Sequence, residues 1–176
     1  LLLELLDVSG CIVTADAMNC QREIAKKITD GEGDYVLSLK ENQPTLYEYA
    51  ETYFRDALEH PQWYPEMRSC ETLDKGHGRI EKRTYYLSPE LSGLEKAQNW
   101  PGLAGIGMVC SHVTMGETKS FEVRYAITSL KSVSAFAYAM RKHWGIENGL
   151  HHCLDVSFHE DRSRIRKDHS PDNLAV

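Results

Sequence analysis

Two acidic residues, Asp16 and Glu147, occupy positions where a carboxylate could bind a cation or a ligand. Glu147 falls on the apolar stripe that helical spacing gives to the run from Phe136 to Asp155. Because burying an uncompensated charge is costly, a carboxylate on such a face is favoured when it is paired or binds a cation. Asp16 follows a short apolar run, at the edge where open α/β sheets bind ligands. Spacing alone leaves two further interpretations open: a rotated helix that exposes Glu147, and an ordinary turn acid at position 16.

The two carboxylates together would suit a divalent metal. A hard cation such as Mg²⁺ takes oxygen ligands and keeps several waters. Two such ions about 4 Å apart activate an attacking oxygen and stabilise a leaving one in phosphodiester chemistry, which normally needs a third carboxylate. If Asp16 and Glu147 serve one site, we expect their carboxyl groups to face a common cleft within about 8 Å of each other.

The residues around Asp16 predict a strand–helix–strand unit. Residues 11–15 and 35–39 are short, apolar and rich in β-branched side chains, as buried strands are. Residues 19–29 between them have helical periodicity and are followed by glycines. The two strands should be parallel, with a right-handed crossover. Asp16 ends the first strand, and Lys40 ends the second.

A change of pattern begins near residue 61, after a helix expected over residues 46–58. A strand is expected over 80–87, and two more, over 106–114 and 120–128, are joined around Met115-Gly116. Such a segment before a final helix is typical of an insertion into an α/β core. The predicted organisation is therefore residues 1–60 as the first part of the core, 61–130 as a β-rich insertion, and 131–176 as the C-terminal part of the core with the helix that carries Glu147.

Composition excludes some classes of protein. The chain has 176 residues, 41% of them hydrophobic and 26% charged, which is ordinary for a globular protein. No apolar run approaches the length of a membrane span, so no membrane association is expected. The net charge of −6 argues against a general nucleic-acid coat, although residues 162–167 and 75–83 are locally basic. Five cysteines without a CxxC pair predict reduced thiols in a cytoplasmic protein.

Four segments, in order along the chain, resemble the insertion-sequence DDE transposases, in particular the branch that includes the H-repeat-associated proteins. They are VTADAMNCQREIAKKI, GDYVLSLKENQ, HGRIEKR and HWGIENGLHHCLDVSFHEDRSRIRK. The resemblance covers nearly the whole chain. It implies a ribonuclease H-like core with a β insertion before the last catalytic helix. It also implies that Asp16 and Glu147 are the second and third acids of a catalytic triad that binds Mg²⁺ or Mn²⁺.

The function that this resemblance implies is DNA transposition. Water would cut a DNA strand, and the freed 3′-hydroxyl would attack target DNA. The expected partners are therefore transposon-end and target DNA, and the active protein would be a homo-oligomer. Lys40, Arg79 and His143 are candidate DNA contacts, although a lysine at a strand end or an arginine at a strand start is equally typical of solvated surface.

The sequence departs from the family pattern in two places. The first acid of the family lies on a strand upstream of Leu1, and both ends of the sequence read as interrupted helices. We therefore expect a piece of a longer protein that by itself neither cuts nor joins DNA. Around the catalytic Glu, the wider family has Tyr, Arg and Lys where this chain has Met140, His143 and Leu154. The HWGIE form is associated with this branch.

Three alternatives remain. A zinc site could use the adjacent His151, His152 and Cys153, but adjacent helical residues point in different directions and lack zinc-ligand spacing. The chain could be a catalytically inactive DNA-binding relic, which an acidic residue on an upstream strand would argue against. It could also be a metal-dependent nuclease on the same core, because hydrolysis and strand transfer would use the same acids.

Overall fold

A computed structural model describes residues 2–76, 78–94 and 97–145 of the chain. Its elements, in chain order, are α1 (Leu2–Leu5), β1 (Ile12–Ala15), the 3-10 turn η1 (Ala17–Asn19), α2 (Arg22–Asp30), β2 (Asp34–Leu39), α3 (Pro44–Glu59), η2 (Pro61–Trp63), β3 (Arg68–Gly76), β4 (Arg79–Ser88), η3 (Ala97–Asn99), β5 (Gly105–Met115), β6 (Thr118–Thr128) and α4 (Val133–Gly145). The fold of the described residues is mixed α/β, as predicted.

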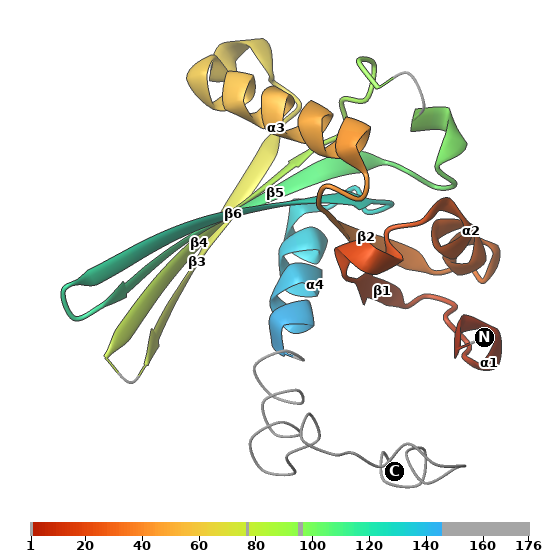
Figure 1. Cartoon of the computed structure of the whole chain (residues 1–176), viewed down its shortest axis with the longest axis horizontal. Coiled ribbons are helices and arrows are strands. Elements are labelled where there is room, and N and C mark those ends of the chain that lie inside the picture. Colours follow the sequence, from red (N-terminus) through yellow and green to blue (C-terminus); the bar gives the residue numbers. More distant parts are fainter. Residues whose placement is uncertain (1, 77, 95–96, 146–176) are drawn as a thin grey trace, which may run out of the picture. The chain divides into compact units, whose positions relative to one another are not determined.

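The strands form a six-stranded mixed sheet in the order β1-β2-β6-β5-β4-β3 (Figure 1). β1 and β2 are parallel, and every other neighbouring pair is antiparallel. The chain divides into two compact units, Leu1–Met140 and Arg141–Val176. The whole sheet therefore belongs to the first unit.

The strand–helix–strand unit predicted around Asp16 is confirmed, but the prediction that its first strand is buried is wrong: Ile12 is exposed and the rest of β1 only half-buried, because β1 comes first in the strand order. β1 pairs in parallel with β2, and α2 between them buries Ala25 and Ile28. The helix begins later than predicted, at Arg22 instead of Asn19. The reason is local: residues 17–19 form a 3-10 turn, and the backbone of Gln21 is extended, with φ −134° and ψ 145°.

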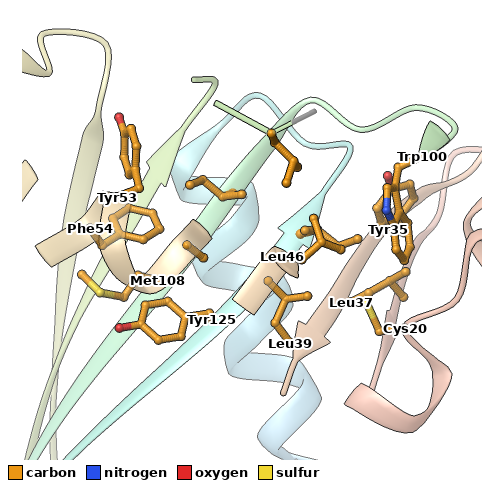
Figure 2. Close-up of a cluster of buried hydrophobic side chains, with 14 of the residues drawn as sticks. Cys20, Tyr35, Leu37, Leu39, Leu46, Tyr53, Phe54, Trp100, Met108 and Tyr125 are labelled. Carbon is orange, nitrogen blue, oxygen red and sulfur yellow. The ribbon is translucent and has the colours of Figure 1, made fainter. Parts of the chain in front are cut away.

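The principal core lies between α3 and one face of the sheet (Figure 2). From α3, Leu46 and Phe54 are buried against this face; they are eight residues apart and so lie on one side of the helix. Phe54 stacks on Tyr125 of β6, with ring centroids 6.3 Å apart. Met108, the β5 neighbour of Tyr125, is buried beside it. Aromatic packing thus fixes α3 across the sheet.

The opposite face of the sheet is covered by the first part of α4, up to Met140. Gly107 alternates with Met108 along β5, so it points to this other face. The ring of Phe136 lies directly on it: a Cβ at Gly107 would come within 2.3 Å of the Phe136 Cζ atom. Phe136 and Met140 are both buried, as the helical stripe predicted. Gly107 is therefore required by the close approach of a helix.

Beyond the part of the sheet that α3 and α4 cover, β3, β4, β5 and β6 continue as two antiparallel hairpins. Only the last four residues of β6 pair with β2, from Tyr125 to Thr128. We call the remaining outer part the arm, residues 72–76, 79–83, 111–115 and 118–122, which are in register with one another. The predicted strands 80–87, 106–114 and 120–128 are confirmed, with ends one or two residues away. The β3 strand was not predicted.

The β-rich segment continues the sheet of the first strands, because β6 pairs directly with β2. The division at residues 60 and 130 remains a prediction about how the core and the insertion are related. Among the described residues, Cys11, Cys20, Cys70 and Cys110 are free thiols. None of the helices within these residues is long and apolar enough to cross a membrane.

Candidate active site

Asp16 lies immediately after the last residue of β1, with an exposed side chain. Its backbone is extended, with φ −67° and ψ 165°, and its carbonyl oxygen accepts a hydrogen bond of 2.9 Å from the Asn19 backbone N–H. The chain therefore turns sharply at Asp16, because η1 begins at once. An exposed carboxylate at such a strand end is accessible to a cation or a ligand.

Lys40 lies at the matching end of the neighbouring strand. β1 and β2 are parallel, and Ala15 stands opposite Leu37, so both strands end at the same edge of the sheet. Lys40 follows Leu39 and is exposed, like Asp16. This edge thus carries one anionic and one cationic side chain from adjacent strands.

Two side-chain amides join the loops that follow these strands. The Asn42 Nδ2 group donates a hydrogen bond to the carbonyl oxygen of Ala17. The Gln43 Nε2 group donates one of 2.9 Å to the carbonyl oxygen of Cys20. Each bond connects residues more than twenty positions apart in sequence. Asn42 and Gln43 therefore hold the Asp16 loop against the Lys40 loop, a role that the sequence prediction missed.

Two helices also begin at this edge. α2 starts at Arg22, shortly after Asp16, and α3 starts at Pro44, shortly after Lys40. The N-terminus of a helix carries a partial positive charge and unpaired backbone N–H groups, which favour anions such as phosphate. Together with Lys40, the two helix ends make this edge suitable for a phosphate group near the Asp16 carboxylate.

Arg79 lies in the direction in which β1 and β2 end, but further out, at the tip of the arm. It stands opposite Met115, which pairs with Thr118, whereas the last residue of β6 beside β2 is Tyr125. Seven residues of strand correspond to roughly 20 Å. Arg79 is exposed, and its Nη2 atom lies 2.8 Å from the Glu81 Oε2 atom. The sheet therefore places Arg79 beyond the edge that carries Asp16, not beside it.

The remaining predicted site residues lie in the C-terminal part of the chain. His143 is in the last turn of α4, within the second compact unit, whereas Asp16 and Lys40 belong to the first. Glu147 lies outside the described residues, as do His151, His152 and Cys153 of the zinc alternative. The 8 Å distance between the Asp16 and Glu147 carboxyl groups remains a prediction.

Across residues 2–76, 78–94 and 97–145, no group of three or more His, Cys, Asp or Glu side chains is arranged to hold a metal ion. The exposed carboxylate of Asp16 is a suitable oxygen ligand for a hard cation, and within this part of the chain it would supply one ligand of such a site.

The sequence was compared with known proteins. Residues 1–171 match the family described as "Transposase DDE domain". The chain is 39% identical over 176 residues to a protein of Escherichia coli O157:H7 named "Putative transposase YncI", covering 94% of this chain and 43% of that protein. It is 35% identical over 173 residues to "H repeat-associated putative transposase YhhI" of Escherichia coli strain K12, covering 94% of this chain and 45% of that protein. No solved structure matches.

The family match extends over nearly the whole sequence, and the chain spans less than half the length of these curated relatives. The resemblance seen in the four sequence segments is thereby confirmed. The mixed α/β fold is consistent with it. This chain belongs to the DDE transposase family.

Proposed function

We propose that the chain forms part of the catalytic domain of a DNA transposase, with a ribonuclease H-like core. The observation that carries this proposal is the position of Asp16 at the carboxyl end of β1, exposed and beside Lys40 at the end of the parallel strand β2. The reaction is metal-dependent cleavage of a DNA strand, followed by attack of the freed 3′-hydroxyl on target DNA. Asp16 and Glu147 are the metal ligands in this chain.

The described residues perform separable tasks in this proposal. The Asp16 carboxylate binds a cation, and Lys40 binds the DNA phosphate as a point charge. Asn42 and Gln43 keep the two loops together, because each amide spans from the Lys40 loop to a carbonyl in the Asp16 loop. The α2 and α3 N-termini favour the negative charge of the same phosphate. Divalent metal, when bound, would activate the attacking oxygen and stabilise the leaving oxygen.

The arm supplies a second contact with the same DNA. Arg79 lies roughly 20 Å beyond the Asp16 edge along the strand direction. This corresponds to roughly six base-pair steps of DNA at 3.4 Å each. Because β4 also lies three strands to the side of β2, roughly 14 Å, a duplex whose scissile phosphate lies at Asp16 and Lys40 would reach Arg79 by running obliquely across the sheet. His143 is the remaining proposed contact.

Metal binding by the purified 176-residue chain tests the proposal. Thermal unfolding is measured with and without Mn²⁺ for the wild type, Asp16→Asn, Glu147→Gln and the control Asp30→Asn. A ligand that binds only the folded state raises the melting temperature, so the wild type and the control should show a Mn²⁺-dependent rise. Asp16→Asn and Glu147→Gln should lose it. Glu147→Gln should also melt slightly higher without metal, because two neighbouring carboxylates repel each other.

Asp30 is a suitable control because it is an exposed acid in the same unit and pairs with Lys26 at 2.5 Å. NMR adds the location of the bound metal. Paramagnetic Mn²⁺ should broaden the backbone amide signals of Ala17 and Asn19 and leave that of Gly116, at the arm's tip, sharp. Equal rises in melting temperature for the wild type and Asp16→Asn would contradict the assignment of Asp16.

A further inference from the structure

The outermost strand of the arm, β3, has an open edge. Within the described residues, β3 comes last in the strand order and pairs only with β4, over nine residues. In Figure 1 it runs along the outside of the hairpins. A long exposed edge strand presents unpaired backbone N–H and C=O groups that can pair with another strand. Leu73, in the middle of β3, is 58% exposed.

The backbone groups that face this open edge can be identified from the turn between β3 and β4. Gly76 pairs with Arg79 across a two-residue connection, and Gly78 within it has φ +74°, as two-residue hairpin turns require. In such a hairpin the flanking pair exchanges hydrogen bonds, so Gly76 and every second residue before it face β4. The backbone groups of Glu71, Leu73 and Lys75 therefore face outwards.

When two copies of β3 lie antiparallel, the outward-facing residues Glu71, Leu73 and Lys75 of one copy are complementary to those of the other. If two copies of β3 pair antiparallel about a two-fold axis at Leu73, the two Leu73 side chains lie opposite each other. The same register places Glu71 opposite the partner's Lys75, and Lys75 opposite the partner's Glu71. Opposite charges in directly facing positions stabilise a strand pair, and an apolar pair at the centre adds to this.

Glu71 can take part in such a contact without losing those that it already makes. Its Oε1 atom lies 2.8 Å from the Lys82 Nζ atom and accepts a hydrogen bond of 3.1 Å from the Thr84 hydroxyl. Both contacts use Oε1. The Oε2 atom can therefore accept a hydrogen bond from the partner's Lys75.

Thr72, on the other face of β3, supports the same register. Its hydroxyl makes no hydrogen bond within the described residues and is covered by the chain's own atoms, so it reaches a partner by rotation of the side chain about χ1. A two-fold axis at Leu73 places Thr72 opposite the partner's Asp74, whose carboxylate accepts hydrogen bonds. Shifting the axis to Thr72 would instead place Glu71 opposite Leu73, a charge against an apolar side chain. The axis at Leu73 is therefore the better register.

The arm has a second open stretch, at the outer part of β6, which lacks this complementarity. By the same hairpin geometry, its outward residues are Lys119, Phe121 and Val123, because Met115 pairs with Thr118 across a two-residue turn. A two-fold axis at Phe121 would place Lys119 opposite Val123. No charges are matched there. Of the two open stretches of the arm, the β3 edge is therefore the one suited to a second copy.

We propose that the β3 edge is a self-association surface, through which two copies of this chain pair antiparallel about a two-fold axis at Leu73. The sheet then continues from one copy into the other. Such an interface is isologous, since each residue meets its counterpart through the two-fold axis. The association uses main-chain hydrogen bonds for affinity and the Glu71–Leu73–Lys75 pattern for register. It does not depend on metal or DNA.

Sedimentation velocity of the purified chain over a range of concentrations tests the proposal. The wild type should show a concentration-dependent monomer–dimer equilibrium. Leu73→Lys places two like charges opposite each other, so it should weaken the dimer at least tenfold. Phe121→Lys is the matched control, because Phe121 is 59% exposed on the same arm; its dimer should be as strong as that of the wild type. A wild type that stays monomeric up to millimolar concentration would overturn the proposal.

Mixing two charge variants tests the register itself. Glu71→Lys gives a chain with two lysines at positions 71 and 75, and Lys75→Glu gives a chain with two glutamates, so neither should pair with itself. An equimolar mixture should form heterodimers, because every facing pair is then of opposite charge. Far-UV circular dichroism checks that both variants are folded. Self-association of either variant at wild-type strength, or failure of the folded mixture to form heterodimers, would overturn the two-fold axis at Leu73.

Discussion

Between α3 and α4, both faces of the sheet are covered by apolar side chains. In the arm, the same strands carry a network of ion pairs on one face. Under α3, Phe54 is fully buried and packs on Tyr125. In the arm, Arg83 is almost fully buried as well, but its neighbours are carboxylates. Its Nη1 atom lies 2.6 Å from Asp74 Oδ2, and its Nη2 atom lies 2.5 Å from Glu81 Oε1.

One sheet is thus stabilised in two ways. Where a helix covers a strand, apolar side chains lose contact with water, and packing supplies the stabilisation. Where no described helix covers it, a buried guanidinium is tolerated because two carboxylates compensate its charge. The arm should therefore depend on specific charged partners, and the covered part on side-chain volume. The predictions below test this contrast.

The largest effect is expected in the covered part. Phe54→Ala removes a fully buried ring between α3 and the sheet, which should lower the free energy of unfolding by about 3–5 kcal/mol. Chemical denaturation monitored by circular dichroism measures this. Leu58→Ala, on the same helix at a position that is 47% exposed, should cost less than about 1 kcal/mol. Equal losses would mean that α3 is not held by its buried face.

In the arm, removing a charged side chain should lower the free energy of unfolding more when that side chain is buried. Arg83→Ala leaves Asp74 and Glu81 without their shared partner, and should lower the free energy of unfolding by about 3 kcal/mol, at the low end for a broken buried pair. The low end is expected because Arg79 still pairs with Glu81.

Arg79→Ala is the matched comparison for this charge removal. Its side chain is 52% exposed, so its loss should cost at most about 1 kcal/mol. Chemical denaturation of both variants gives the difference. A larger loss for Arg79→Ala than for Arg83→Ala would show that burial does not set the strength of this network.

The smallest effect, over the range from pH 8 to pH 10, concerns the pH dependence of the core. Burial raises the pKa of the Cys20 thiol from 9.0 to about 12. The folded state therefore holds this proton more tightly, so its contribution to stability is complete below pH 9 and is lost as the pH rises towards 12. The wild type should lose roughly 1 kcal/mol for each pH unit above 9, relative to Cys20→Ala.

Denaturation midpoints at pH 8, 9 and 10 measure this slope. Cys11→Ala is the control, because Cys11 is exposed, and its midpoints should follow those of the wild type. Alkylation followed by peptide mass spectrometry gives an independent measure: Cys11 should react faster than Cys20 in the folded protein. If the denaturation midpoints of the wild type and Cys20→Ala change equally with pH, the buried Cys20 thiol is not the cause of the pH dependence.

The candidate site could be predicted in part from local patterns. Asp16 and Lys40 were found because each directly follows an apolar run that forms a strand, half-buried in β1 and buried in β2, and the parallel pairing of the two strands followed from the helix between them. Asn42 and Gln43 could not be found in this way. Their hydrogen bonds reach Ala17 and Cys20, so they exist only once the two loops are adjacent.

The strands and helices that bury apolar side chains could be predicted from the sequence. β4 alternates between buried and less buried positions, β5 buries its first seven residues and β6 its last four, and α3 buries one side of the helix, so their apolar residues marked all four. β3 could not be found in this way. Its sequence, RSCETLDKG, is mostly polar, because an exposed edge strand has no buried face to encode. It is held as a strand by nine pairs with β4, and because an isolated two-stranded hairpin is at best marginally stable, those pairs depend on the rest of the sheet.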